Sequence, residues 1–292
     1  MTPVEYCHDK AAKSGSSFYY AFLFLPPERR LASTALYAFC REVDDVVDEC
    51  SDPSVARIKL AWWRTQIDKM FQGQPDHPVM QALMPWLDKF NITADKLTAI
   101  VDGMEMDLAQ TRYLDWPGLQ RYCWHVAGVV GNLSAGIFGH TEEATLRYAE
   151  KLGLAFQMTN IIRDVGDDAR RGRIYLPIDD LQQYGVKAAD ILNGKNSDAF
   201  RALMAFEAER ARTLYREAVA LLPEADRRAQ RPGLMMAAIY YALLNEIEHE
   251  QWQVLDQRIS LPPIRKLWIA WKNWVGGARP VLKQIQATRP KQ

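Results

Sequence analysis

The sequence predicts an all-α protein, and three observations support this fold class. Apolar residues recur at spacings of three and four over most of the 292 residues, as one face of a helix requires. Alternating apolar and polar runs between turn residues, which would predict strands, are missing. Helix starts carry prolines and short polar caps. We therefore expect a single helical domain over residues 1–292, with residues 261–292 forming a basic, Trp-rich tail.

Helix starts and breaks give the order of the elements. Gly172, Pro177 and Gly185 interrupt the pattern, so loop and short helix are expected between about Gly166 and Gly185. Helical segments are expected from about Glu28 to Cys50, from Pro53 onward, after caps at Thr93 and Thr141, and near residues 197–222 and 232–256.

Charge and cysteine usage exclude several classes of protein. Lys plus Arg and Asp plus Glu number 36 each, so the basic excess of a nucleic-acid-binding protein is missing and no nucleic-acid partner is expected. The four cysteines form no C-x-x-C pair, which argues against a zinc site or a disulfide framework and favours a reduced, cytoplasmic setting. No window reaches the roughly 18 apolar residues that a membrane span needs.

An acidic motif interrupts the apolar pattern of the first long helix. Tyr37, Arg41, Asp44 and Asp48 fall within an arc of roughly 60° at about 100° per residue, so they line one stripe. A single Asp-x-x-x-Asp stripe is more often a solvated helix face. Apolar residues surround this one, however, and Asp is a poor residue for the middle of a helix.

A second motif of the same kind lies far along the chain. Gln157, Asn160, Asp164 and Asp168 occupy an arc of about 80°, and Arg163 lies beside them. Two such stripes, each with an arginine near its first aspartate, are much less expected by chance than one. We therefore expect the two helices to present their carboxylates to a common cavity.

Carboxylates on two facing helices need cations between them, because their like charges otherwise repel. Mg²⁺ fits, since it takes carboxylate oxygens and completes its shell with water and phosphate oxygens. The Asp clusters themselves, residues 44–48 and 164–168, contain no His or Cys that would indicate a softer metal. They predict several Mg²⁺ ions that bridge the protein to a diphosphate and turn it into a leaving group.

Further residues suit a diphosphate and a hydrocarbon tail. Arg170, Arg171 and Arg173 follow the second motif, where a solvated loop and a phosphate-binding loop are equally good interpretations. Residues 122–139 are apolar and rich in glycine, and each mid-helix glycine costs up to about 1 kcal/mol against alanine. Tight helix packing and the wall of a hydrocarbon channel both remain open; other walls of such a channel are Phe18, Phe22 and Phe156.

These stretches resemble the squalene and phytoene synthase family, whose members share an all-α isoprenoid synthase fold. The resemblance rests on SSFYYAFLFLPPERR, YAFCREVDDVVDE, YCWHVAGVVG and AFQMTNIIRDVGDDARRGRIYLP. It extends over most of the chain, to about residue 260. It implies a single helical domain with a central cavity.

The resemblance also implies roles for residues of this sequence. Metal binding is implied for Asp44, Asp48, Asn160, Asp164 and Asp168. Catalytic assistance, by diphosphate binding or cation shielding, is implied for Tyr37, Arg41, Tyr122 and Arg163. Substrate contacts are implied for Ser17, Phe18, Phe22, Gln157, Arg173 and Tyr175.

Within the family, the wording CREVDDVVDE and DGMEMDL looks most like bacterial presqualene diphosphate synthases of hopanoid biosynthesis. Such an enzyme is a Mg²⁺-dependent prenyltransferase that joins two farnesyl diphosphates head to head (1′-1), and it needs no NADPH for this half-reaction. Phytoene synthesis from geranylgeranyl diphosphate, or dehydrosqualene synthesis, is the nearest alternative. A non-catalytic helical assembly factor of the same fold is an alternative of another class, which the intact aspartate motifs disfavour.

The C-terminal segment is basic and aromatic. Residues 257–292 hold eight Lys or Arg and no Asp or Glu, and Trp268, Trp271 and Trp274 recur every three residues. The pattern is typical of a peripheral membrane anchor, and equally of a terminal helix that docks its Trp face on the core. The anchor interpretation places a cytoplasmic protein at the inner membrane surface, with downstream pathway enzymes as further expected partners.

Overall fold

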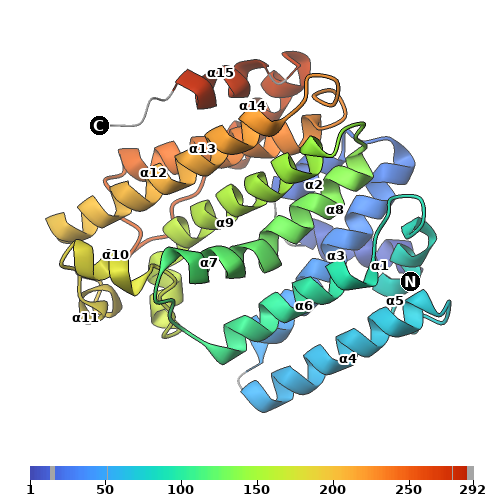
Figure 1. Ribbon diagram of the computed structural model, residues 1–292, viewed down its shortest axis with the longest axis horizontal. Coiled ribbons are helices and arrows are strands. Elements are labelled where there is room, and N and C mark those ends of the chain that lie inside the picture. Colours follow the sequence, from blue (N-terminus) through green and yellow to red (C-terminus); the bar gives the residue numbers. More distant parts are fainter. Residues whose placement is uncertain (14–16, 51, 278, 288–292) are drawn as a thin grey trace.

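The computed structural model describes residues 1–13, 17–50, 52–277 and 279–287, and these residues form helices joined by loops (Figure 1). No strand occurs in these ranges, where extended backbone pairs only in an isolated bridge between Arg112 and Ile174. The predicted all-α class is therefore confirmed. The first elements are α1 (Pro3–Lys13), α2 (Ser17–Phe22), α3 (Pro27–Glu49), α4 (Pro53–Phe71), α5 (Pro78–Leu83), the 3₁₀ turn η1 (Met84–Trp86), α6 (Ala94–Ala109) and α7 (Trp116–Cys123).

The remaining elements follow α7 without a change of class. They are the π-helical turn η2 (Trp124–Gly128), α8 (Val129–Phe138), α9 (Ala144–Arg170), α10 (Ile178–Gln183), α11 (Ala188–Leu192), α12 (Asp198–Leu221), α13 (Arg231–His249), α14 (Pro263–Val275) and α15 (Arg279–Ala287). None of these helices, within the described residues, is both long and apolar enough to span a bilayer.

Several helix boundaries agree with the sequence signals. α3 begins at Pro27, after Pro26, and α4 begins at Pro53. Asp52 caps α4, because its Oδ1 accepts a hydrogen bond from the Ser54 amide at 2.8 Å. Thr93 stands at the N-cap position of α6, although its side chain makes no capping hydrogen bond.

The expected break at Gly166 was wrong, because α9 continues to Arg170. The Gly166 amide donates to the Val254 carbonyl at 3.2 Å, and a Cβ at Gly166 would lie 2.3 Å from the Leu255 carbonyl oxygen. This glycine therefore permits a second stretch of backbone to cross the helix closely.

Two other boundary predictions also need correction. α13 ends at His249 rather than near residue 256, since Gln251 and Trp252 take positive φ angles of 53° and 60°. Thr141 does not cap a helix, because α9 begins only at Ala144. Its amide and hydroxyl instead donate to Asp226, which lies far along the chain.

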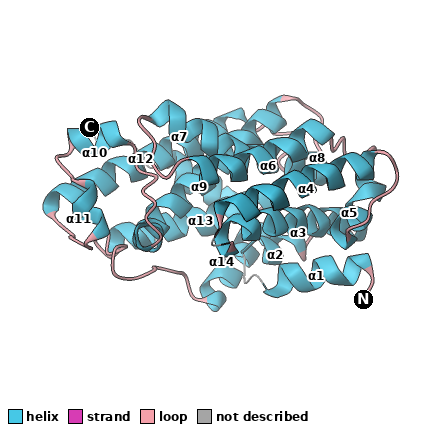
Figure 2. Ribbon diagram, turned by 90° about the horizontal axis from the view of Figure 1, so that it is seen from below, coloured by secondary structure: helices cyan, strands magenta, loops and turns pink. Residues whose placement is uncertain are grey.

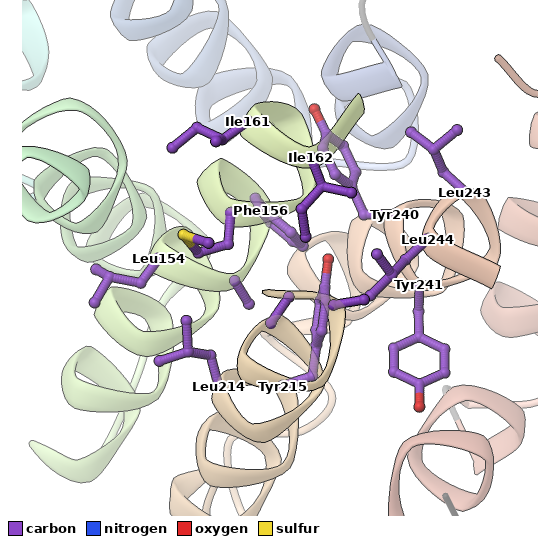
Figure 3. Packing of buried hydrophobic residues seen from close by; sticks show 14 of the residues in the cluster. Leu154, Phe156, Ile161, Ile162, Leu214, Tyr215, Tyr240, Tyr241, Leu243 and Leu244 are labelled. Carbon is purple, nitrogen blue, oxygen red and sulfur yellow. The ribbon is translucent and has the colours of Figure 1, made fainter. Parts of the chain in front are cut away.

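The buried side chains form two main clusters. The first is built by α1, α3, α4, α5 and α6, and the second by α9, α12, α13 and the C-terminal helices. Figure 3 shows the second cluster, where Phe156 of α9 faces Tyr215 of α12 and Tyr240 of α13. α8 lies between the clusters, contributing Leu133 to the first and Ala135 to the second.

Glycines allow α9 to pack closely against the segment that precedes it. A Cβ at Gly131 would lie 2.2 Å from the Ala149 carbonyl oxygen, and a Cβ at Gly153 would lie 2.3 Å from the Ala127 carbonyl oxygen. Tight packing of the glycine-rich segment is thereby confirmed. The same segment also lines a cavity, so the two interpretations of residues 122–139 hold together.

Candidate active site

A cavity of about 270 Å³ lies between the two buried clusters. α3 contributes Arg41 and Asp44 to its wall, and α9 contributes Gln157 and Asn160. The two predicted stripes therefore reach one common cavity. Most of the remaining wall is apolar or aromatic and includes Phe18, Phe22, Tyr37, Tyr122, Phe156 and Tyr240.

Aromatic side chains meet at the centre of this wall. The ring of Phe18 lies 6.0 Å from Tyr37, 6.2 Å from Phe156 and 6.4 Å from Tyr240, measured between ring centroids. Phe22 lies 6.2 Å from Tyr37 on another side. The cavity thus has aromatic faces next to a charged end, and such faces stabilise a cation while excluding water.

The aspartates of the α3 stripe are paired with basic side chains, one from α3 itself and others from the segment that follows α9. Arg41 Nη1 donates to Asp44 at 2.6 Å. Asp48 receives Arg171 Nη1 at 3.1 Å, and Arg173 Nη1 lies 3.8 Å away. The enclosed position of Asp44 and the nearby Asp48 charge raise the pKa of Asp44 to about 6, against the pull of Arg41.

The two aspartates of the α9 stripe differ in whether arginines pair with them. Although burial opposes it, hydrogen bonds from Arg163 at 2.7 Å and Arg258 at 2.8 Å hold the pKa of Asp164 below its ordinary value. For Asp168, burial and the charges of Asp164 and Asp107 raise the pKa to about 7. The charged form of Asp168 is therefore less well compensated by neighbouring cations than that of Asp164.

Asp107 of α6 is a site residue that the sequence reasoning missed. It is 8% exposed and accepts hydrogen bonds from Tyr175 Oη at 2.8 Å and Tyr122 Oη at 3.2 Å. Arg173 Nη1 lies 3.6 Å from it. The sequence carries one usable signal, since Asp107 continues the buried stripe of Ile100 and Met104 at helical spacing.

The structure places most predicted site residues around this cavity. Eight line it directly: Phe18, Phe22, Tyr37, Arg41, Asp44, Tyr122, Gln157 and Asn160. Arg173 lies near both Asp48 and Asp107, and Tyr175 donates to Asp107. Arg163 and Asp164 pair with each other one turn before Asp168. The side chain of Ser17 lies outside the described residues. Arg258 and Tyr240 join the site without having been predicted.

The donors present fit a hard divalent cation. Asn160 Oδ1 is buried and accepts no hydrogen bond from any residue that the structure describes, although Asn160 Nδ2 donates to Gln157 at 3.3 Å. Among the described residues, no three His, Cys, Asp or Glu side chains converge as a closed metal cage. The carboxylates instead stand as pairs one helical turn apart, which suits Mg²⁺ because it binds few carboxylates and takes its other ligands from phosphate and water.

Comparisons with known proteins agree with this geometry. The family model described as squalene/phytoene synthase matches residues 11–265. A phytoene synthase of Arthrospira platensis is 36% identical over 279 residues, covering 90% of this chain and 89% of that protein. Phytoene synthase 3 of Zea mays is 34% identical over 267 residues, and there the match spans only 63% of the longer plant protein.

Solved structures show the same fold. The chain is similar to a dehydrosqualene synthase crystallised with a ligand, with a TM-score of 0.81, 28% identity and coverage of 98% of this chain and 97% of that one. It is also similar to the squalene synthase HpnC of Alicyclobacillus acidocaldarius, with a TM-score of 0.73, 28% identity and coverage of 86% and 94%. The chain, with its isoprenoid synthase fold, belongs to the squalene/phytoene synthase family, whose members are prenyltransferases.

Proposed function

We propose that the protein is a Mg²⁺-dependent synthase that condenses two farnesyl diphosphates head to head into presqualene diphosphate, releasing diphosphate and a proton. One observation carries the proposal. Asp44 of one aspartate stripe and Asn160 of the other line the same aromatic cavity, and Asn160 Oδ1 is buried there with no hydrogen-bond partner among the residues that the structure describes. Such a cavity suits substrates that join a strongly anionic head to an apolar tail.

The residues divide the work by position. Asp44, Asp48, Asn160, Asp164 and Asp168 would hold Mg²⁺, which supplies charge neutralisation to the leaving diphosphate. Arginines at the charged end bind diphosphate oxygens, because guanidinium groups match them in geometry and charge; they are Arg41, Arg163, Arg171, Arg173 and Arg258. The tails lie along the apolar wall.

The reaction then proceeds inside the aromatic part of the cavity. The C1–O bond of one substrate breaks, and diphosphate leaves with the electron pair. The double bond of the second substrate attacks the allylic cation, and loss of a proton closes the cyclopropane, with the released diphosphate as the proton acceptor. The faces of Phe18, Tyr37 and Phe156 stabilise the cation and keep water away.

Phytoene synthesis from two geranylgeranyl diphosphates is the second candidate, and one finding favours it. The sequence relatives at 33% to 36% identity include phytoene synthases of Arthrospira platensis and Synechocystis sp.. The similar solved structures at 28% identity are instead named dehydrosqualene and squalene synthase. Both candidates use the same charged end and differ in tail length.

Product identification separates the two candidates. Purified protein is incubated with Mg²⁺ and either farnesyl or geranylgeranyl diphosphate, without NADPH, and the products are identified by mass spectrometry. Presqualene diphosphate from the shorter substrate is the expected result. Phytoene from the longer substrate, with no turnover of the shorter one, would replace the first candidate by the second.

A binding measurement tests the metal site without turnover. Mg²⁺ together with inorganic pyrophosphate should raise the melting temperature of the parent protein, because ligands that bind only the folded state stabilise it. Asp44→Asn and Asp164→Asn should each abolish this rise and lower kcat/KM at least about 1000-fold. Glu49→Gln is the control, since Glu49 is an exposed residue next to Asp48. Full activity of either aspartate variant contradicts the assignment.

A further inference from the structure

The helix α14 exposes the side that an ordinary surface helix would bury. Five of its seven large apolar residues recur at positions i, i+3, i+4, i+7 and i+11, which places these five within an arc of about 100°. All of them face solvent: Ile264 is 82% exposed, Leu267 45%, Trp268 59%, Trp271 50% and Val275 67%. We call these five residues the α14 stripe.

The opposite side of α14 is the one that is docked on the protein. Ala270 and Asn273 are buried, and Asn273 Oδ1 accepts a hydrogen bond from the Val281 amide at 3.1 Å. The Trp274 ring packs against Phe24 in a tilted arrangement, with ring centroids 4.9 Å apart, and lies under the Arg231 guanidinium. The expectation of a docked Trp face thus holds for Trp274 alone. Because the helix is fixed by this side, the α14 stripe is held outward.

The charged residues of α14 and α15 are all basic. Lys272, Arg279 and Lys283 are exposed, and none has an acidic partner within the described ranges. Arg265 is exposed too, but it pairs with Glu246 at 2.7 Å. Since residues 257–292 contain no Asp or Glu, this end of the molecule presents positive charge beside exposed indole rings.

We propose that the α14 stripe docks onto the surface of a lipid bilayer that carries anionic head groups. Tryptophan and aliphatic side chains suit the boundary between head groups and acyl chains, and basic residues beside them are attracted to anionic lipid. A protein partner fits less well. A standard interface buries about 800 Å² on each partner, whereas this surface is a single stripe on one helix.

The position of α14 gives this docking a consequence for the cavity. α14 packs against α2 and, through Trp274, against Phe24 in the turn that follows α2, and α2 supplies Phe18 and Phe22 to the cavity wall. Figure 2 shows α14 next to α2 at the lower edge of the molecule. Docking would therefore bring the apolar wall close to the bilayer. This consequence rests on the proposed function, but the docking itself does not.

Vesicle flotation tests the surface directly. The full chain is mixed with vesicles of phosphatidylcholine alone, or with about 30% phosphatidylglycerol, at low salt. The parent should float with the anionic vesicles. Trp268→Ser with Trp271→Ser should lower the bound fraction about tenfold, because it removes the two largest apolar contacts. Lys272→Glu with Lys283→Glu should abolish the preference for anionic lipid.

A matched control replaces exposed apolar side chains on a different helix. Ile58→Ser with Trp62→Ser on α4 also exchanges an exposed tryptophan and an exposed aliphatic residue, 44% and 69% exposed, and should leave flotation unchanged. The proposal is overturned if the parent stays unbound, or if the α14 double variant floats like the parent. It is also overturned if light scattering shows a dimer that this variant dissociates.

Failure of the docking and failure of the proposed function are distinguishable. Flotation contains no substrate, so it reports on the stripe alone. Turnover in detergent micelles contains no bilayer, so it reports on the cavity alone, and the α14 double variant should turn over there at the parent's rate.

Discussion

Asp107 and Asp226 are both buried, 8% and 2% exposed, yet the protein holds their charges in opposite ways. Asp226 accepts hydrogen bonds from the Thr141 amide at 2.8 Å, the Thr145 hydroxyl at 2.6 Å and the Glu142 amide at 3.1 Å. Although burial opposes it, the hydrogen bonds from Thr145 and Thr141 lower the pKa of Asp226 to about 2. The fold therefore stabilises this charge.

The partners of Asp107 compensate its burial less completely than those of Asp226 do. Burial raises its pKa, while Arg173 at 3.6 Å and the hydroxyls of Tyr175 and Tyr122 offset this only in part. The surroundings of Asp107 therefore stabilise its charged form less than the surroundings of Asp226 stabilise that of Asp226. The difference indicates that Asp226 is retained for stability and Asp107 for the site, where shifted pKa values concentrate.

Among the variants that test this contrast, Asp107→Asn should have the largest effect, and the effect is on turnover. The amide offers one acceptor oxygen to two tyrosine hydroxyls and removes the charge that faces Arg173, so kcat/KM should fall about 100-fold. The raised pKa of Asp107 means that its charged form destabilises the folded protein at pH values above the pKa in the unfolded chain. The Asn variant removes this cost, so its melting temperature at pH 8 should equal or exceed that of the parent. Steady-state kinetics and thermal unfolding measure the two effects.

Asp102→Asn is the control for this prediction. Asp102 lies on the same helix and is only partly buried, pairing with Arg64 at 2.7 Å. The kcat/KM of Asp102→Asn should stay within about threefold of the parent, as expected for an ion pair that water reaches. A large loss of stability in Asp107→Asn, with turnover intact, would make Asp107 a structural residue like Asp226.

The contrast between the two aspartates also shows what could be predicted from the sequence. The helices and both aspartate stripes follow from local spacing, which is why α3 and its charged face were expected at the right residues. Asp107 is a single carboxylate at the end of an apolar stripe, and its partners Tyr122 and Tyr175 come from other segments. No local pattern reports such a contact.

Two other features were out of reach for the same reason. The donors to Asp226 lie more than 80 residues away along the chain, at positions 141 to 145. Gly166 was expected to break the helix, because a glycine in the sequence looks the same in two different structural situations. It marks a break in some helices and a close backbone crossing in others, and only the approach of Leu255 distinguishes them.

The next effect in size is on stability, by Asp226→Asn. The folded pKa of about 2 lies below the ordinary value of 3.8, so the charge contributes stability above about pH 4 to 5 that is lost as the pH falls toward 2. A shift of this size corresponds to about 2 kcal/mol. The variant should lose this free energy of unfolding at pH 7, measured by urea denaturation, and the gap to the parent should close below pH 3.

Turnover and a neighbouring residue serve as controls for Asp226. kcat/KM of Asp226→Asn should match the parent at a temperature where both are folded, since Asp226 lies outside the cavity wall. Glu224→Gln should change stability by less than about 0.5 kcal/mol, because Glu224 is 88% exposed. The same difference in unfolding free energy between the parent and Asp226→Asn at pH 7 and at pH 3 would contradict the proposed effect of the Asp226 charge on stability.

The smallest effect is expected from Tyr175→Phe, which withdraws one donor from Asp107 and leaves the other. Tyr122 still donates at 3.2 Å, and the stacked ring at position 175, 5.3 Å from Tyr122, is kept. kcat/KM should fall about tenfold, the size expected for one hydrogen bond to a charged group. Tyr113→Phe is the control, since the Tyr113 ring packs on Tyr122 at 5.5 Å while its hydroxyl makes no bond to Asp107 in the described structure. Equal losses in both variants would mean that ring packing, rather than the carboxylate, organises this end of the cavity.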